Sequence, residues 1–325
     1  MIIVTGGAGF IGSHLIGALN ELAERDILVV DHLTPDCYRS RQKLRNLANL
    51  KFSEYMDKAA FRLALRRRAI DFSKVTAIFH QGACSNTLES DVSYLMDNNF
   101  RYSIDLFEVS ASHRVPFVYA SSAAVYGKVS SFAELSSNER PVNAYGRSKL
   151  LIDNYIRRRI GTVKHTVVGL RYFNVYGTRE SHKGPMASVV HRFHEQLIRS
   201  ALIRIFRGTD GYADGEQRRD FVFVDDVVRA NLYFAFGSAR HAILNIGTGV
   251  THSFNDVAGL LMEHIGKCRV EYIQPPRHLL SQYQSFTMAD IVELRRCGYY
   301  DTFTALADGI LKTVAGCPEE PGCPS

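Results

Sequence analysis

The sequence feature that most constrains the fold is a glycine-rich turn that begins at residue 6. The apolar segment 1–5 ends directly in Gly6-Gly-Ala-Gly9-Phe-Ile-Gly12, and a helical pattern follows. A strand, a glycine turn and a helix in this order are typical of the first unit of a dinucleotide-binding fold. The glycines let backbone amides approach a pyrophosphate, and the helix N-terminus adds a partial positive charge. We therefore expect Gly6, Gly9 and Gly12 to bind the phosphates of a dinucleotide.

Apolar runs alternate with longer amphipathic stretches through the first half of the chain. Runs that are apolar throughout predict strands covered on both faces, and their alternation with helices predicts a parallel sheet. We expect an α/β fold with a doubly wound parallel Rossmann sheet. Strands are expected at residues 1–5, 27–31, 75–80, 116–121 and 166–172, and helices at Phe10–Arg25, Tyr94–Arg114 and Tyr145–Arg159.

The pattern loosens after residue 172, which predicts a second, smaller α/β region built from several C-terminal segments. A helix is expected around 186–200, and apolar runs at 220–224 and 242–246 predict two more strands. The end of the chain is rich in proline and glycine, which predicts a disordered tail. We divide the chain into a dinucleotide-binding domain at 1–172 to which 220–248 returns, a substrate-binding region at 173–219 and 249–312, and a tail at 313–325.

The composition argues against several classes of protein. The formal net charge of +6 suits an anionic ligand, but the cations form no patterned stripe of the kind that binds nucleic acid. The histidines, cysteines and acids lack metal-ligand spacing, so no metal is expected. There is no membrane-spanning run and no signal peptide, so we expect a cytoplasmic protein whose six cysteines are reduced.

An acidic residue at the end of the second predicted strand bears on the choice of dinucleotide. Asp31 follows Gly12 by nineteen residues, where a carboxylate bonds the free ribose 2′-hydroxyl of NAD. The stretch after it is rich in cations, which can instead bind the 2′-phosphate of NADP. These cations are His32, Arg39, Arg41, Lys43, Arg45, Lys51 and Lys58. The residues themselves leave NAD and NADP both open.

A tyrosine and a lysine four residues apart form the best acid/base pair in the sequence. The spacing places Tyr145 and Lys149 on one face of a helix. A neighbouring ammonium favours the phenolate and lowers the pKa of the tyrosine towards the range of efficient proton transfer. Ser122 follows the preceding strand, at the sheet edge where ligands bind, and its hydroxyl can hold a substrate oxygen against Tyr145.

These motifs together resemble the extended short-chain dehydrogenase/reductases, a family that modifies nucleotide sugars. The matching segments are Thr5–Ser13, Ser121–Ser122, Tyr145–Lys149, Arg171–Gly177, Arg218–Val227 and Leu244–Gly249. Within this family the chain is most similar, over roughly residues 1–312, to the epimerases that act on ADP-heptose. The segments that carry this closer likeness are 54–58, 79–85, 96–99, 182–184, 186–189 and 282–287.

The resemblance implies an isomerase that inverts C6″ of ADP-D-glycero-D-manno-heptose through a transient ketone, with tightly bound NADP taking and returning the hydride. Tyr145 and Lys183 would be the two acid/bases, and Lys149 and Ser122 would complete the catalytic set. The resemblance further implies a homo-oligomer, by the family pattern a pentamer, with no nucleic-acid or membrane partner. Its product would supply heptose for the inner core of lipopolysaccharide.

Contact residues follow from the resemblance position by position. The cofactor contacts would be Gly6, Gly9, Phe10, Ile11, Gly12, Asp31, His32, Lys43, Lys58, Gln81, Gly82, Ala83, Cys84, Ser85, Asn98, Lys149, Val175 and Lys183. The substrate contacts would be Asn174, Phe206, Arg207, Gly208, Thr209, Arg219 and Tyr283. Arg219 would bind the diphosphate in bidentate fashion, the alternative being a structural ion pair with Asp220 or a neighbouring acid. His182 could act as an acid or as a donor to an anionic substrate.

Two other interpretations remain open at this point. Another nucleotide-sugar epimerase or dehydratase, such as a UDP-hexose 4-epimerase, would share Tyr145 and Lys149 but would not need Lys183. A non-catalytic dinucleotide sensor could use the same fold, although it would have no use for a set of acid/base residues. The chain departs from the family pattern at His32, Gln81, Pro185 and Arg192, and no substrate contact is assigned to the last two.

Overall fold

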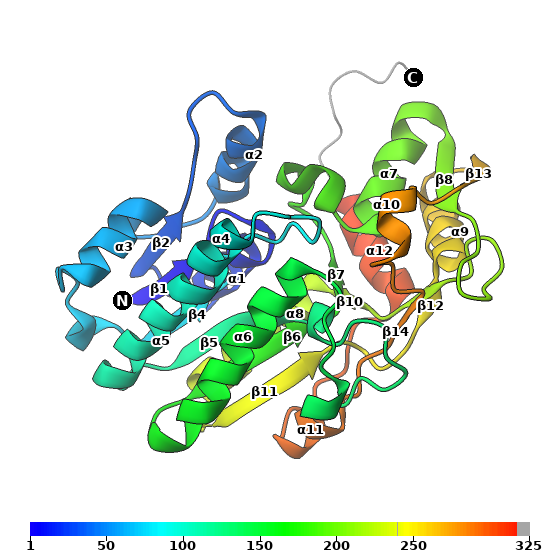
Figure 1. Cartoon of the computed structure of the whole chain (residues 1–325). Helices are drawn as coiled ribbons and strands as arrows, with labels where there is room; N and C mark the ends of the chain where they lie inside the picture. The colour runs from blue at the N-terminus through cyan, green and yellow to red at the C-terminus, as the bar shows by residue number, and fades with distance from the viewer. Residues whose placement is uncertain (239, 317–325) are drawn as a thin grey trace.

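The computed structural model describes residues 1–238 and 240–316. A seven-stranded, entirely parallel sheet in the order β11-β6-β5-β4-β1-β2-β3 forms its centre (Figure 1). The strands are β1 (Ile2–Thr5), β2 (Ile27–Asp31), β3 (Glu54–Asp57), β4 (Ala77–His80), β5 (Phe117–Ser122), β6 (Val167–Tyr172) and β11 (His241–Ile246). The strand order reverses between β1 and β4, and ligands bind at the carboxyl ends of the strands at such a point. The predicted parallel α/β sheet is confirmed.

Helices cover both faces of the sheet, so each strand is buried from two sides. They are α1 (Phe10–Glu21) and α8 (Val224–Phe236) on one face, and α3 (Lys58–Arg66), α5 (Tyr102–His113) and α6 (Ala144–Arg159) on the other (Figure 1). Within β1, Ile2 and Val4 pack into the first core and Ile3 into the second. This two-sided burial explains why the strands are apolar throughout.

Three local features differ from the prediction. The sequence does not reveal β3, because this edge strand pairs only with β2 and its side chains are partly exposed. The helix expected at 94–114 is divided into α4 (Val92–Leu95), a π-helix (Met96–Arg101) and α5. The first helix ends at Glu21 instead of Arg25.

A second group of elements lies beyond the carboxyl ends of the strands and has its own core (Figure 1). Its three small sheets are β8 (Leu202–Phe206) with β13 (Arg269–Ile273), β7 (Asn174–Tyr176) with β10 (Phe221–Phe223), and β9 (Arg218–Arg219) between β12 (His252–Ser253) and β14 (Phe286–Thr287). Its helices are α7 (Val189–Ser200), α9 (Phe254–Ile265) and α12 (Leu306–Ala315). The remaining helices are α2 (Tyr38–Leu47), α10 (Arg277–Leu280) and α11 (Val292–Arg296), and 3-10 turns span Phe72–Lys74, Ala123–Val125, Ser136–Asn138, Ile160–Thr162 and Ser181–Met186.

The predicted tail at 313–325 begins too early. Helix α12 continues to Ala315 and buries Ile310 and Thr313, so its last turn packs as part of the fold. The rest of the predicted tail, 317–325, lies outside the described residues and includes two of the six cysteines. The other four cysteines are free thiols.

Candidate active site

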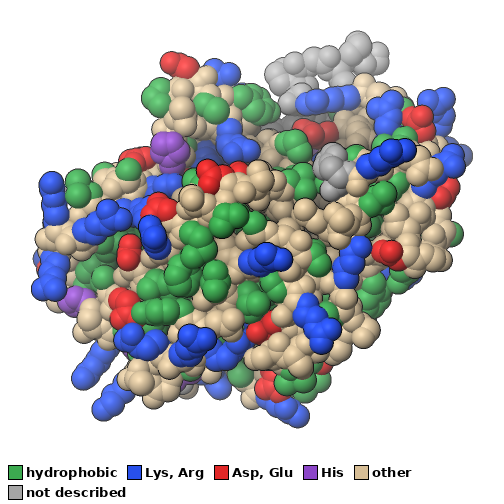
Figure 2. Space-filling model, in the orientation of Figure 1, with side chains coloured by type: hydrophobic (Ala, Val, Ile, Leu, Met, Phe, Trp, Pro, Cys, Tyr) green, Lys and Arg blue, Asp and Glu red, His purple; other side chains and the backbone are tan. Residues whose placement is uncertain are grey.

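A cavity of about 850 Å³ lies at the carboxyl ends of the central strands. The space-filling view shows the surface hollowed between the part that carries α2 and the part that carries α7 (Figure 2). The lining includes every residue expected to bind the cofactor or to act in catalysis, together with Asn174 and Arg219. The remaining expected substrate residues, 206–209 and Tyr283, do not line this cavity.

The glycine turn forms one wall and fits a dinucleotide. Gly6 has a φ of +67°, and a Cβ there would lie 2.7 Å from the backbone nitrogen of Gly82. A Cβ at Gly12 would lie 2.2 Å from the Gly6 carbonyl oxygen. Gly9 is the N-cap of α1 and supplies no side-chain acceptor, so the first amides of the helix are left for an external anion.

Polar groups at the end of β2 are paired with one another. Asp31 accepts hydrogen bonds from a backbone amide of the glycine turn at 2.9 Å and from Lys43 Nζ at 2.6 Å. Lys58 Nζ donates to Asn98 Oδ1 at 2.6 Å, and burial lowers the pKa of this lysine. Arg39 lines the same wall. Lys43 and Lys58 near Asp31, with Arg39 in the same cavity lining, supply positive charge of the kind that a ribose 2′-phosphate requires.

Tyr145 and Lys149 lie on the buried face of α6, 8% and 3% exposed respectively. Burial raises the pKa of Tyr145, while a hydrogen bond with Ser122 acts in the opposite direction. Lys149 Nζ donates to the Ala120 carbonyl at 2.8 Å, and burial lowers the pKa of Lys149 to about 8. The expectation that Lys149 gives Tyr145 a lowered pKa is therefore wrong, because burial outweighs the polar neighbours.

A buried ion network anchors α6 to the sheet. Arg171 on β6 is fully buried and bonds Asp153 of α6 at 2.9 Å and Glu139 at 2.5 Å. Asp153 also accepts a hydrogen bond from Ser121 Oγ at 2.9 Å. Because Asp153 lies one helical turn after Lys149, the network connects the acid/base helix to the end of β5.

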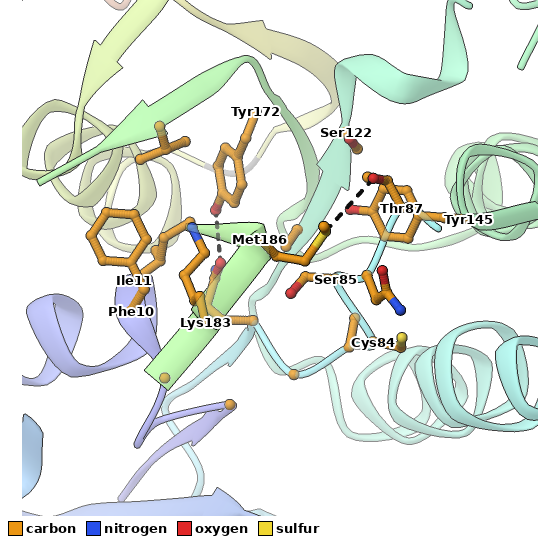
Figure 3. Close-up of a pocket in the computed structure, with 18 of the residues that line it drawn as sticks. Phe10, Ile11, Cys84, Ser85, Thr87, Ser122, Tyr145, Tyr172, Lys183 and Met186 are labelled. Carbon is orange, nitrogen blue, oxygen red and sulfur yellow. Dashed lines mark hydrogen bonds between the residues drawn. The ribbon is translucent and has the colours of Figure 1, made fainter. Parts of the chain in front are cut away.

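Lys183 and Tyr145 lie on opposite sides of the cavity. Figure 3 shows Lys183 beside Phe10 and Ile11, with Tyr145 across the pocket. Lys183 Nζ is 2.7 Å from a carboxylate oxygen of Glu180 and 4.7 Å from the centre of the Phe10 ring. Two side chains able to transfer protons thus line one cavity from different segments of the chain.

Arg219 forms a wall at the other end of the cavity. Its guanidinium lies over the rings of Phe254 and Tyr283, at 5.4 and 5.2 Å from their centres, and burial lowers its pKa. Asp220 instead accepts hydrogen bonds from Thr248 and from backbone amides. The alternative of an Arg219–Asp220 ion pair is wrong. Over the described residues Arg219 forms no salt bridge, which leaves its charge for a phosphate.

Of the other expected substrate residues, Tyr283 contacts this arginine and Phe206 contacts Tyr283. The rings of Phe206 and Tyr283 contact each other at 6.1 Å, and Thr209 Oγ1 is 2.7 Å from Ser285 Oγ. Tyr283 therefore belongs to the wall that Arg219 presents to the cavity, whereas Arg207 is exposed. Asn174, by contrast, lines the cavity, and its amide donates to Thr287 Oγ1 at 3.1 Å.

Several lining residues have no role in the sequence-based assignment. They include Thr34, Cys37, Ser40, Asn86, Thr87, Tyr94, Tyr102, Tyr172, Met186, Ala187, Ser188, Val189, Phe254, Gln284 and Thr287. The segments 186–189 and 282–287 stand out in the sequence by their resemblance to the family, and this signal would have identified Met186 and Gln284. Thr34, Asn86 and Thr87 come from loops that carry no motif, whereas Tyr94, Tyr102 and Phe254 lie on helices.

Two features are absent from residues 1–238 and 240–316. No three His, Cys, Asp or Glu side chains are grouped so that they could hold a metal ion. No helix in the same residues has both the length and the apolar character needed to cross a membrane.

Comparison with known proteins gives consistent matches. Residues 2–247 match the NAD dependent epimerase/dehydratase family. The chain is 49% identical over 321 residues to the ADP-L-glycero-D-manno-heptose-6-epimerase of Alkalilimnicola ehrlichii, which covers 98% of each chain. The crystal structure of the Helicobacter pylori ADP-L-glycero-D-manno-heptose-6-epimerase superposes with a TM-score of 0.83 at 31% identity, covering 97% of this chain and 95% of that one. The Thermus thermophilus UDP-glucose 4-epimerase complex with NAD gives 0.77 at 27% identity, covering 97% of both chains. The family resemblance drawn from the sequence is confirmed.

Proposed function

This chain belongs to the NAD dependent epimerase/dehydratase family, and on that premise we propose that it interconverts ADP-D-glycero-D-manno-heptose and ADP-L-glycero-D-manno-heptose. The 49% identity to a relative of that name, over almost the whole of both chains, supports this substrate. The observation that carries the proposal is the presence of Tyr145 and Lys183 on opposite sides of one cavity that also contains a dinucleotide turn.

The bound cofactor is proposed to be NADP. Lys43, Lys58 and Arg39 would surround the 2′-phosphate, while the glycine turn would bind the pyrophosphate. NADP supplies a hydride acceptor that returns the same hydride, so the reaction has no net redox change. Asp31, already bonded to Lys43, would be partly neutralised beside the phosphate.

The chain's own residues are proposed to move the alcohol proton at C6″. When the C–H bond breaks, the hydroxyl proton would pass to a base on one side of the cavity, and when the ketone is reduced on its other face an acid on the opposite side would supply a proton to its oxygen. Tyr145, with Ser122 in the same lining, would serve one orientation of the C6″ group. Lys183 would serve the other orientation, because proton transfer requires heavy atoms within about 3 Å and one group cannot satisfy both.

The ADP moiety is proposed to extend towards Arg219. A guanidinium that is stacked between two rings and has no carboxylate partner among the described side chains suits bidentate binding of a diphosphate. Asn174 and Thr287 would contribute hydrogen bonds on the same side.

Incubation of the purified protein with ADP-D-glycero-D-manno-heptose tests the proposal directly. We expect the L-glycero epimer by NMR, NADP by mass spectrometry of the denatured enzyme, and no free NADPH. NADPH released in proportion to product would identify a dehydrogenase. Conversion of a UDP-hexose but not of the ADP-heptose would identify a 4-epimerase.

We also propose that the chain acts in the cytoplasm as a homo-oligomer, with the pentamer implied by the family as the specific expectation, and that it supplies heptose for lipopolysaccharide. The mildly basic net charge and the ordinary composition of the sequence are compatible with a cytoplasmic homo-oligomer. Light scattering on the eluted protein measures the subunit number, and a monomer would contradict the oligomer.

A further inference from the structure

Glu180 is a buried carboxylate that contacts a proposed acid/base residue but has no role in the site as described so far. Its side chain has no exposed surface. One oxygen accepts from Lys183 Nζ at 2.7 Å and from the Ser188 amide at 2.8 Å. The other accepts from Ser188 Oγ at 2.6 Å and from the Gly177 amide at 3.3 Å. All the donors around this carboxylate come from two loops and the start of α7.

The segment that carries Glu180 is fixed to the helix that follows the glycine turn. Arg179 donates to the Ser13 carbonyl at 2.8 Å, and His14 lies 3.2 Å from the Thr178 carbonyl. The carboxylate is therefore held in place relative to α1, the helix whose first turn borders the cavity. A side chain that is bonded to this carboxylate samples fewer rotamers, and its position relative to α1 is therefore fixed as well.

Lys183 is placed by this carboxylate and by one other contact. Its ammonium lies 4.7 Å from the centre of the Phe10 ring, the first residue of α1. Lys183 is 18% exposed at the side chain, so the ammonium retains access to the cavity. A long flexible lysine with only the ring contact would sample several positions, whereas the proposed proton transfer tolerates an error of less than about 1 Å.

We propose that Glu180 is a positioning residue that acts through Lys183, holding its ammonium where the C6″ hydroxyl is bound in one of its two orientations. The inference rests on the proposed function, because it assumes that Lys183 transfers a proton in epimerisation. Glu180 itself touches neither substrate nor cofactor. Its removal should therefore matter only as long as Lys183 is present.

A double-mutant cycle on the cofactor-bound enzyme tests this dependence. Glu180→Gln should lower kcat by about 10²-fold with little change in KM and with NADP retained. In an enzyme that already carries Lys183→Met, adding Glu180→Gln should leave the residual kcat unchanged. Glu195→Gln, at a 40% exposed glutamate on α7, is the matched control and should match the wild type.

Equal losses of kcat in both backgrounds would show that Glu180 acts on the fold and would overturn the proposal, as would an unchanged kcat in the single variant. If Glu180→Gln does not fold, Glu180→Asp keeps the charge and shortens the side chain, and it should give the same dependence on Lys183. Failure of the proposed function looks different, because the wild type would then convert no ADP-heptose at all. In that case the same cycle is measured with the nucleotide sugar that the wild type does epimerise, and equal losses there overturn the positioning role.

Discussion

The cofactor side and the substrate side of the cavity are built in different ways. The cofactor side uses the glycine turn and the ends of β2 and β4, all within the first hundred residues. The substrate side uses Asn174, Arg219 and Thr287, which lie on three short strands from distant parts of the chain. The comparison shows that short sequence motifs can predict much of a cofactor site, whereas a substrate site can depend on how separate segments of the chain assemble.

The two sides also differ in how their cations are held. Lys43 and Lys58 are bonded to Asp31 and Asn98, so a ligand phosphate must share them with protein groups. Arg219 is held by aromatic rings, and its charge is offset by no carboxylate within the described residues. Substitutions on the two sides should therefore affect different measurements.

The largest effect is expected where the two sides meet. Tyr145→Phe removes one hydroxyl and keeps the ring, so kcat should fall by about 10²- to 10⁴-fold while folding and bound NADP are retained. Steady-state kinetics and absorbance of the bound cofactor measure this. Tyr155→Phe, on the same helix but bonded to Glu108, is the control. A near-normal kcat in Tyr145→Phe would contradict the proposed chemistry.

Next in size is the combined substitution of Lys43 and Lys58 by alanine, which probes the cofactor side alone. Each charged contact to the 2′-phosphate is worth about 1.5–3 kcal/mol, so NADP affinity should fall by at least about tenfold more than NAD affinity. Calorimetric titration of the cofactor-free variant with each dinucleotide measures the ratio. Lys51→Ala, an exposed lysine nearby, should change neither affinity. Equal losses for both dinucleotides would assign the pair a structural role.

On the substrate side, Arg219→Met should raise KM by roughly 10- to 100-fold through the loss of one charged contact to the diphosphate. Because Arg219 lies away from the β2 end of the cavity, bound NADP should be unchanged. Kinetics over a range of substrate concentrations separate KM from kcat. The idea fails if the variant loses its cofactor while its KM stays as in the wild type.

A further effect is a pH dependence of stability from Lys149, whose pKa is about 8 in the folded protein and ordinarily 10.5. Below pH 8 both folded and unfolded chains bind the proton, and the cost of burying the ammonium is fully present. Between pH 8 and 10.5 only the unfolded chain binds it, so the free energy of unfolding should rise by up to about 1.4 kcal/mol per pH unit.

Urea denaturation of the wild type and of Lys149→Met across this range checks the sign. The methionine variant should lack the rise, and Lys164→Met, at an exposed lysine, should keep it. Parallel curves for the wild type and Lys149→Met would mean that Lys149 titrates at its ordinary pKa.

Much of the fold was predictable because its signals are local. The apolar runs locate six of the seven strands of the sheet to within two residues, since helices cover both faces of this sheet. The edge strand β3 escapes prediction because its side chains are partly exposed, so it forms no apolar run. The π-helix at Met96–Arg101 also leaves no periodic signal. It turns Asn98 and Asn99 inward, where they bond Lys58 and the Cys84 amide.

The sequence by itself determined the chemistry available to this protein: a glycine turn for a dinucleotide, and Tyr145 and Lys149 on one helix face. Spacing along one element suffices for such statements, because helix and strand geometry are the same in every fold. Only the tertiary structure decided that the pKa of Tyr145 is raised, that Arg219 is stacked between two rings, and that Lys183 is bonded to Glu180. The first two depend on burial and contacts supplied by segments far away in the chain. The third depends on the conformation of the loop between β7 and α7, which no periodic sequence pattern predicts.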